Sequence, residues 1–376
     1  MRLLEASLLD FRNLAEVQLS FSPGVNVLLG ANGHGKTNVL EALNYPALAR
    51  SFRGARDDEL IRFDADACHL RLTVEEGEAS SEIEVGLDRG GRRRMKVDGE
   101  EIRRRVELVG RLATVVFDPQ TVELVRGGPE VRRRWLDQGI SGVDPEYLAH
   151  LQFTNRALRQ KARLLRDLRR GFASLATVRP DLETWNAELA AHAAPLIRKR
   201  ADWLSRAARA GRDSYIDLAD EKQELQLLYR PGVGVADPGG ENGDFSREIL
   251  NVLDYIISDE IRRGRCLSGP QTDDVDIVLD GVNLRTFGSR GETRTAAISL
   301  KLAQAEIVYG MRGVRPVLFF DDIFSELDKD RSRKLQERTA TDHQVFIATA
   351  RAEDVAGWEP DDARTWTVQE GAVTIR

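Results

Sequence analysis

Residues 30–37 read Gly-Ala-Asn-Gly-His-Gly-Lys-Thr, which is the pattern G-x-x-x-x-G-K-T. The apolar run Val25–Leu29 precedes this stretch, and a helical pattern from Lys36 to Leu43 follows it. Glycines let backbone N–H groups close around phosphates, and a helix N-terminus adds positive potential at the same place. The stretch therefore predicts a nucleotide-binding phosphate loop in an α/β domain.

The residue types within the loop predict separate roles. The Lys36 ammonium is expected to neutralise the β- and γ-phosphates, and the Thr37 hydroxyl is expected to bind Mg²⁺. We expect ATP to contact the loop and the residue after it, namely Gly30, Ala31, Asn32, Gly33, His34, Gly35, Lys36, Thr37 and Asn38.

A site of this class needs a second carboxylate for Mg²⁺, and residues 316–322 (PVLFFDD) supply one. Four apolar residues predict a buried strand, and acids at its C-terminal end lie where an α/β sheet binds ligands. Asp321 is the expected Mg²⁺ ligand, and Asp322 the expected general base for the attacking water. An apolar run before two acids is usually structural, but together with the phosphate loop it predicts an ATPase with Lys36, Asp321 and Asp322 as catalytic residues.

The spacing of these motifs predicts an insertion, because residues 36 and 321 are 285 positions apart. Strand candidates crowd residues 69–117, helical spacing dominates 129–222, and 231–243 is rich in Gly and Pro. Asp144-Pro145 is typical of a helix N-cap followed by a proline in the first turn, and a single helix is expected from about 245 to 262. After residue 270, strand and helix patterns alternate again, with an apolar strand expected at Val345–Thr349. We expect one mixed sheet flanked by helices, built from 1–128 plus 265–376 with a β-rich lobe at 69–117, and an inserted α-helical arm at 129–264.

Composition limits the partners that this chain can have. The net charge is −6, so any nucleic-acid binding must come from local basic patches. No apolar run approaches a membrane span, which favours a cytoplasmic protein without a membrane partner, and the two cysteines form no CxxC pair. Residues 156–170 hold seven Arg or Lys against one acid, which indicates either a solvated helix face or a phosphate-contacting stripe. The DNA-contact candidates are Arg159, Lys161, Arg163 and Arg166, with Arg132, Arg133, Arg134, Arg169 and Arg170 as further ones.

Further residues are placed by their positions in the sequence relative to the phosphate loop and Asp321. Ser289-Arg290-Gly291-Glu292 is by itself a turn and a helix cap, but about thirty residues before Asp321 it resembles the signature motif of ABC-type ATPases. In that family, the signature serine and glycine of one subunit contact the γ-phosphate held by another. Ser325 and Asp328 match the D-loop of the same family, Gln120 lies in the Q-loop region, and Thr349 stands where a switch histidine is common.

Several stretches together resemble the RecF family of bacterial recombination-repair proteins. These are LLDFRN (8–13), the segment around the phosphate loop (21–43), ARSFRG (49–54), VVFDPQTVELVRGGPEVRRRWLD (115–137) continuing through DPEYLAHLQFTNRALRQKARLLR (144–166), GPQTDD (269–274), FGSRGETRTAAISLKLAQAEI (287–307) and VLFFDDIFSELD (317–328). Two departures stand out: the family usually has His-Arg where this chain has Gln271-Thr272, and commonly has Gln where it has Glu292.

The resemblance implies a head like those of SMC and Rad50 proteins with a short helical arm. It implies binding of ATP with Mg²⁺, ATP-dependent homodimerisation, binding to single-stranded, double-stranded and gapped DNA, and weak DNA-stimulated hydrolysis. RecF proteins act at gaps and stalled forks in recombinational repair, replication restart and SOS induction, and they assist RecA loading with RecO and RecR. The alternatives are a transporter-type ABC subunit, against which the arginine-rich insertion and Thr349 argue, and another SMC- or Rad50-type module.

Overall fold

The computed structural model describes residues 1–219, 222–234, 245–340, 342–356 and 363–376. A six-stranded central sheet has the order β15-β14-β3-β13-β12-β8, parallel except for the edge strand β15. Its strands come from both ends of the chain, as predicted: β3 (Val25–Leu29), β8 (Thr114–Phe117), β12 (Val317–Asp321), β13 (Val345–Thr349), β14 (Arg364–Gln369) and β15 (Ala372–Ile375).

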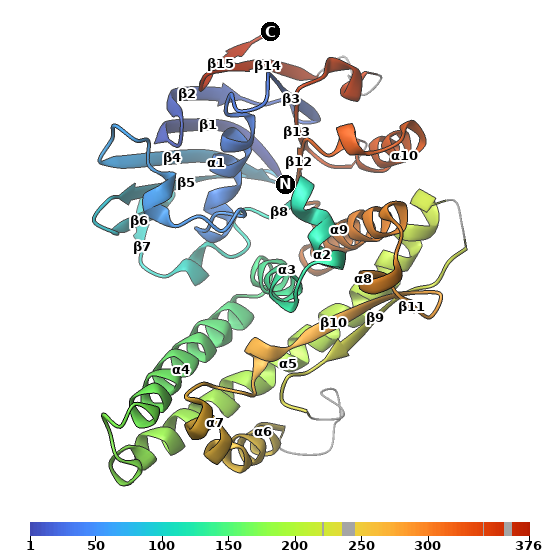
Figure 1. Cartoon of the computed structure of the whole chain (residues 1–376). Coiled ribbons are helices and arrows are strands. Elements are labelled where there is room, and N and C mark those ends of the chain that lie inside the picture. The colour runs from blue at the N-terminus through green and yellow to red at the C-terminus, as the bar shows by residue number, and fades with distance from the viewer. Residues whose placement is uncertain (220–221, 235–244, 341, 357–362) are drawn as a thin grey trace.

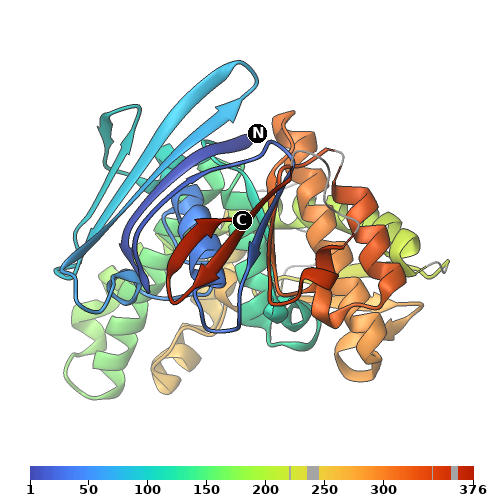
Figure 2. The same ribbon diagram turned by 90° about the horizontal axis from the view of Figure 1, so that it is seen from above.

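Both faces of the central sheet are covered, which explains why β3, β12 and β13 are buried along their whole length. Leu28 and Phe319 pack with helix α1 (Lys36–Leu48) and the second sheet. Val27 and Phe320 pack on the opposite face with α9 (Arg290–Arg312) and α10 (Lys329–Thr339). Figure 2 shows α1 between the two sheets and the α9 and α10 helices on the other side.

The second sheet is antiparallel, with the order β2-β1-β4-β5-β6-β7. It contains most of the predicted β-rich segment, but β1 and β2 join it, and β8 instead pairs with β12. The consecutive apolar residues of β8 are typical of a strand covered on both faces. In the other strands, apolar and polar residues alternate, which is typical of a sheet with one face exposed to solvent. The strands are β1 (Arg2–Phe11), β2 (Leu14–Ser20), β4 (Ala67–Glu76), β5 (Ala79–Asp88), β6 (Arg93–Val97) and β7 (Glu100–Ile102).

Three helices make most of the predicted arm: α3 (Pro129–Ser141), α4 (Pro145–Arg169) and α5 (Leu175–Ala219). The predicted cap is confirmed, because an Asp144 carboxylate oxygen accepts a hydrogen bond of 2.9 Å from the Tyr147 N–H. Figure 1 shows α4 and α5 side by side, projecting away from the sheets. The single helix expected after residue 245 is divided into α6 (Phe245–Tyr255) and α7 (Ile257–Arg263). Residues 235–243 of the expected loop lie outside the described residues.

A small third sheet joins the two sides of the expected boundary at residues 264 and 265. It has the order β11-β10-β9, with β9 (Leu225–Arg230), β10 (Asp274–Leu279) and β11 (Val282–Asn283). Val275 and Leu279 of β10 pack into the same core cluster as Trp203 of α5, so this sheet belongs with the helices. No helix in the described ranges has both the length and the apolar character needed to cross a bilayer.

Candidate nucleotide-binding site

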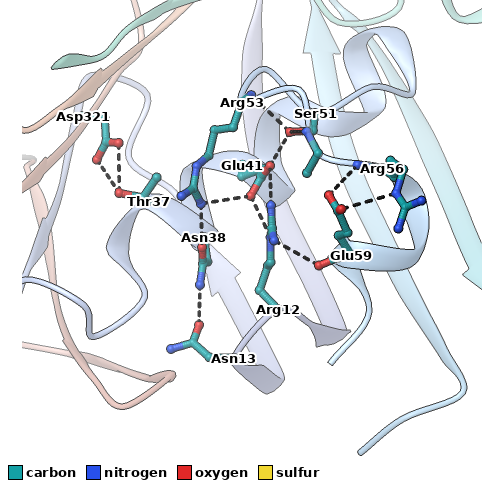
Figure 3. Close-up of polar contacts among 11 residues, drawn as sticks. Arg12, Asn13, Thr37, Asn38, Glu41, Ser51, Arg53, Arg56, Glu59 and Asp321 are labelled. Carbon is teal, nitrogen blue, oxygen red and sulfur yellow. Dashed lines mark hydrogen bonds and ion pairs between the residues drawn. The ribbon is translucent and has the colours of Figure 1, made fainter. Parts of the chain in front are cut away.

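Thr37 and Asp321 meet at the C-terminal ends of two central-sheet strands. The Thr37 hydroxyl donates to the Asp321 carboxylate, at 2.8 Å from one oxygen and 2.9 Å from the other (Figure 3). Thr37 follows β3 through the phosphate loop, Asp321 ends β12, and β13 lies between these two strands. The two residues predicted to share one Mg²⁺ ion therefore lie in direct contact, across 284 positions of sequence.

The Lys36 side chain folds back against the phosphate loop to which it belongs. Its ammonium donates to the carbonyls of Gly30 at 2.7 Å and Ala31 at 3.0 Å, and to the Asn32 side chain at 3.3 Å. The residue is almost fully buried, at 5% exposure. The lysine is thus held at the mouth of the loop by the loop's own backbone, where incoming phosphate oxygens would replace these acceptors.

The electrostatics of the site disfavour isolated charges. Burial is the main cause that raises the pKa of Asp321 to about 6, and the Asp118 and Asp322 carboxylates add to it against the Thr37 hydrogen bond. Burial likewise lowers the pKa of Lys36, against the charges of Asp322 and Asp321. A cation beside Asp321 and an anion beside Lys36 would favour the charged form of each group.

Close backbone approach requires two of the loop glycines. A Cβ atom at Gly30 would lie 2.1 Å from the Val368 carbonyl oxygen of β14. Gly35 has a φ of 110°, and a Cβ there would lie 2.7 Å from the Asn13 side chain. The phosphate loop is therefore clamped between the β1–β2 turn and β14, and only glycine fits at these two positions.

A network of arginines around one buried carboxylate lies beside the phosphate loop, and the sequence did not predict it (Figure 3). Glu41 of α1 is fully buried, and its carboxylate accepts from Arg12 at 3.1 and 3.2 Å and from the Ser51 hydroxyl. Arg53 lies 3.5 Å from the same carboxylate and donates to the Asn38 amide oxygen at 3.3 Å. Arg12 and Arg53 lie in two of the stretches that resemble the RecF family, 8–13 and 49–54, so the sequence marked both residues. Their spacing in the sequence does not show that both contact Glu41.

The signature residues lie at an exposed helix start. Ser289 caps α9: its hydroxyl accepts from the Glu292 N–H at 3.2 Å, and the Glu292 carboxylate accepts from the Ser289 N–H at 2.7 Å. Hydrogen bonds from the Ser289 backbone and hydroxyl lower the pKa of Glu292, so this departure from the family is used as a helix cap. Ser289 is exposed, and no recorded hydrogen bond joins it to the phosphate loop within the described ranges.

The remaining motif residues bind locally. The Ser325 hydroxyl donates to the Asp322 carbonyl at 2.9 Å, and Asp328 caps α10 by accepting from the Arg331 N–H at 2.9 Å. Gln120 is exposed and lines a cavity of about 200 Å³. The Thr349 hydroxyl donates to the Asp354 carboxylate at 2.7 Å, beside the Gly30 N–H that donates to the Thr349 carbonyl.

The acids of the GPQTDD stretch are structural in this chain. The fully buried Asp273 carboxylate accepts from Arg200 and from the Tyr229 hydroxyl, each at 2.5 Å. Asp274 pairs with Arg132 at 2.7 Å. These contacts join α5, α3 and the β9–β10 sheet, so the two acids hold the arm together at its base.

The departures Gln271 and Thr272 contact only their own turn and a neighbouring one. The Gln271 amide donates to the Ser268 carbonyl at 2.9 Å. The Thr272 hydroxyl is within 2.7 Å of the Gly269 carbonyl and 3.3 Å of the Gly232 carbonyl. Neither side chain reaches the phosphate loop through a recorded contact in the described residues.

The basic stripe on α4 is confirmed in part. Exposed arginines recur at spacings of three and four, which places them on one face of the helix: Arg156, Arg159, Arg163, Arg166 and Arg170.

Two DNA-contact predictions are wrong. Lys161 is fully buried and pairs with Glu260 of α7 at 2.6 Å, because its position turns toward the core rather than along the stripe. Arg132 is also buried, in its pair with Asp274. Arg133 and Arg169 donate to the Asp273 and Arg263 carbonyls, at 2.6 and 3.0 Å, which leaves the exposed stripe as the better-supported surface.

Comparison with known proteins agrees with this geometry. The model of the RecF/RecN/SMC N-terminal domain matches residues 3–370. A DNA replication and repair protein RecF from Heliobacterium modesticaldum is 34% identical over 377 residues, covering 100% of this chain and 99% of the relative. The RecF of Lactobacillus delbrueckii subsp. bulgaricus is 32% identical over 363 residues, covering 96% of this chain and 94% of the relative.

Solved structures show the same likeness. A structure of the recombination mediator protein RecF with ATP, in the RecFOR pathway, has a TM-score of 0.90 at 30% identity, covering 100% of this chain and 97% of the other. The SMC head domain of Pyrococcus furiosus shares the fold, with a TM-score of 0.55 at 15% identity, covering 100% and 95%. The mixed sheet flanked by helices and the long helical arm are thus those of an ABC-type ATPase head, and the chain belongs to the RecF family of DNA replication and repair proteins.

Proposed function

We propose that this chain is a DNA-binding ATPase that dimerises around ATP. The contact between Thr37 and Asp321 is the observation that carries the proposal, because it places a hydroxyl and a carboxylate where they suit Mg²⁺ with nucleotide phosphates. Mg²⁺ typically binds one or two protein oxygens and completes its coordination shell with phosphate and water oxygens. The Thr37 hydroxyl and the Asp321 carboxylate are a donor pair of this kind. In this proposal Thr37 and Asp321 hold the ion, which neutralises phosphate charge, while Lys36 and the loop amides bind the phosphates.

The exposed signature supports a site shared between two copies. Ser289 and Gly291 lie at the N-terminus of the long helix α9, which has positive potential and backbone N–H groups to offer an anion. In a dimer, the Ser289 end of one copy would cap the γ-phosphate bound by the other, and Ser325 and Asp328 would lie near the shared surface. Asp322, beside Asp321, would polarise the attacking water, and hydrolysis would weaken the interface.

The arginine stripe supports contact with DNA phosphates. Arg159, Arg163 and Arg166 are exposed on one face of α4. Among the described residues, they form a single ion pair, from Arg163 to Asp167, which is long at 3.9 Å. Such a face binds DNA with little sequence preference and with strong dependence on salt. Together with its RecF relatives, this favours a cytoplasmic role at gapped DNA and stalled forks, with RecO- and RecR-type mediators, RecA loading, and repair linked to the SOS response.

One pair of measurements tests the proposal. Sedimentation with Mg-ATP should convert the unaltered chain to a dimer, whereas Lys36→Ala should stay monomeric and Asp322→Asn should dimerise and remain trapped. Gapped DNA should raise the slow rate of ATP hydrolysis. A chain that stays monomeric in Mg-ATP would contradict the proposal, and an ATPase rate indifferent to DNA would favour the transporter-type alternative.

A further inference from the structure

Helix α9 turns one face toward the edge strand β8 and the segment that follows it. Residues at spacings of three and four along it line two cavities on that side: Arg294, Ala297, Ile298, Lys301, Gln304 and Val308. Arg294 in its first turns pairs with Glu326 of the D-loop at 2.7 Å, and Gln304 accepts from the Trp135 indole N–H at 2.9 Å. Lys301 lies between these two satisfied contacts.

Lys301 has no such contact. Within the described ranges, its ammonium makes no direct hydrogen bond or ion pair, and the half-buried side chain lines the larger cavity. Burial lowers the pKa of Lys301, and the charge of the Asp118 carboxylate opposes that shift. A half-buried ammonium that lines a cavity and has no direct partner can pair with a carboxylate that approaches it, and its place on the signature helix would let such a pair act on that helix.

The segment that carries Asp118 has space on both sides. Asp118 and Gln120 line the same cavity of about 200 Å³ as Lys301, between α1, β8, α3 and α9. A smaller cavity of about 20 Å³ lies between the segment 117–122 and the first turns of α9. Close-packed segments resist displacement, whereas a segment bordered by two cavities can shift at low cost.

Asp118 also neighbours the proposed metal site. Phe117 of β8 is in register with Phe320 of β12, and the strands are parallel, so Asp118 and Asp321 follow them at the same edge of the sheet. Asp118 therefore lies next to Asp321 on one side and shares a cavity with Lys301 on the other. ATP with one Mg²⁺ ion carries net negative charge, so its arrival beside Asp321 would favour movement of the Asp118 carboxylate toward the ammonium.

We propose that Lys301 is a positioning residue that pairs with Asp118 when nucleotide and metal ion occupy the Thr37–Asp321 site, and that this pair fixes α9 at the angle that presents Ser289 to a second copy. The inference rests on the proposed function, because it assigns a cause to ATP-dependent dimerisation. Lys301 touches neither nucleotide nor metal in this scheme. It couples one site to the other through the segment 118–122 and the length of α9 between residues 301 and 289.

The test compares Lys301→Met with Lys301→Arg, Asp118→Asn and the double variant Lys301→Met/Asp118→Asn. Lys96→Met, which alters an exposed lysine on β6 in the antiparallel sheet, is the matched control. Three quantities are measured: binding of a fluorescent ATP analogue to dilute monomer, the dimer dissociation constant in Mg-ATP by sedimentation, and the thermal unfolding midpoint.

Lys301→Met should leave monomer binding of the analogue within about twofold and weaken dimerisation about tenfold, a usual size for coupling between sites. Its unfolding midpoint should be unchanged or higher, because methionine fills similar space without a buried charge. Lys301→Arg should restore most of the dimerisation. The double variant should be no weaker than either single variant, since both remove the same pair.

Two results would overturn this inference alone: unchanged dimerisation of Lys301→Met, or a loss that tracks a fall in the unfolding midpoint and adds to that of Asp118→Asn. Failure of the unaltered chain to dimerise in Mg-ATP would overturn the proposed function and this inference with it. Equal losses in Lys96→Met would also contradict a specific role for Lys301.

Discussion

At the scale of single residues, the proposed Mg²⁺ site depends on the Thr37–Asp321 contact. Asp321→Asn keeps the shape of the side chain but removes the negative charge that a divalent ion requires. We expect the apparent Mg²⁺ affinity, measured by titrating Mg²⁺ against a fluorescent ATP analogue, to fall by about 10- to 100-fold. Thr37→Ser, which keeps a hydroxyl, is the control and should lose far less. Unchanged Mg²⁺ dependence in Asp321→Asn would place the ion elsewhere.

The raised pKa of Asp321 gives this site a pH dependence with a definite sign. Its pKa lies at about 6 against an ordinary 3.8, so the folded chain holds a proton that the unfolded chain releases. The resulting contribution to stability is complete below the ordinary pKa and is lost as pH rises through about 6. Metal binding needs the charged form, so Mg²⁺ affinity should fall as pH decreases through about 6, and Asp321→Asn should abolish that trend.

Glu292 tests a departure from the family at the same scale. Because Glu292 closes a capping box with Ser289, Glu292→Gln should keep the hydrogen bond and change the free energy of unfolding by less than about 1 kcal/mol. The lowered pKa of Glu292 means that its contribution to stability is present above the ordinary 4.5 and is lost as pH falls further. Urea unfolding at neutral and acidic pH should show that Glu292→Gln removes this acid sensitivity. A large loss at neutral pH would indicate a role beyond the cap.

At the scale of elements, strands and helices with strong periodic patterns were predicted well. The runs Val25–Leu29 and Val345–Thr349 match β3 and β13, because strands buried on both faces read as unbroken apolar segments. The contact of Thr37 with Asp321 was also predictable, because a phosphate loop needs a carboxylate at the end of a nearby buried strand to complete its Mg²⁺ site. Sequence alone fails where pairing depends on distant segments, as for β8, which leaves the β-rich lobe, and β9, which pairs with β10.

The same limit applies to side-chain direction. Lys161 lies within a basic run, yet it points into the core, where Glu260 of α7 pairs with it. The partner is 99 positions away in sequence, so local composition gave no sign of it. Pro46 was expected to end or kink the helix after the phosphate loop, but α1 continues through it to Leu48, because a proline near the last turn disturbs few hydrogen bonds.

The buried acid Asp273 should decide the stability of the arm's base. Asp273→Ala removes acceptors from Arg200 and Tyr229 and leaves a buried guanidinium with one carboxylate, Asp137. We expect the free energy of unfolding in urea to fall by about 3–5 kcal/mol. Asp202→Ala, which removes an exposed ion pair with Arg206 on the same helix α5, should cost less than about 1 kcal/mol. Similar losses in the two variants would contradict a special role for the buried network.

The arginine stripe on α4 makes a prediction about salt. The triple variant Arg159→Gln/Arg163→Gln/Arg166→Gln should weaken binding to gapped DNA and reduce the slope of log K against log salt by about one for each lost phosphate contact. Arg206→Gln/Arg212→Gln is the control, because these exposed arginines already lie beside Asp202 and Asp213. Fluorescence anisotropy at several salt concentrations measures the DNA affinity and its salt dependence for each variant. An unchanged slope in the triple variant would move the DNA surface away from this face of α4.

At the scale of the whole molecule, the fold keeps the two halves of the proposed shared site apart within one copy. The phosphate loop and Asp321 lie at one edge of the central sheet, whereas Ser289 lies exposed at the start of α9. A homodimer with twofold symmetry would bring the loop of each copy to the helix start of the other and so form two equal sites. In the proposed dimer, the bound nucleotide would therefore control assembly of the two copies.

Mixing two defective variants tests that shared site directly. Lys36→Ala should lack phosphate binding but keep an intact signature, and Ser289→Arg should keep its loop but block the signature with a bulky cation. Each alone should show almost no ATP-dependent dimer or hydrolysis, while an equal mixture forms heterodimers with one complete site. Because neither variant pairs with itself, every dimer in the mixture should be a heterodimer with one complete site out of two, so its hydrolysis rate should reach at most about half that of the unaltered chain.

The controls for this mixture follow from local structure. Ser289→Arg also removes a helix cap worth about 1 kcal/mol, so its unfolding midpoint must be compared with that of Ser289→Ala, which loses the same cap without added bulk. Recovery should disappear when one partner carries both Lys36→Ala and Ser289→Arg, because no pairing then completes a site. An ATPase that works with both halves of the site in one copy would give the opposite pattern: Ser289→Arg alone would lose hydrolysis without dimerisation being involved, and mixing would restore nothing.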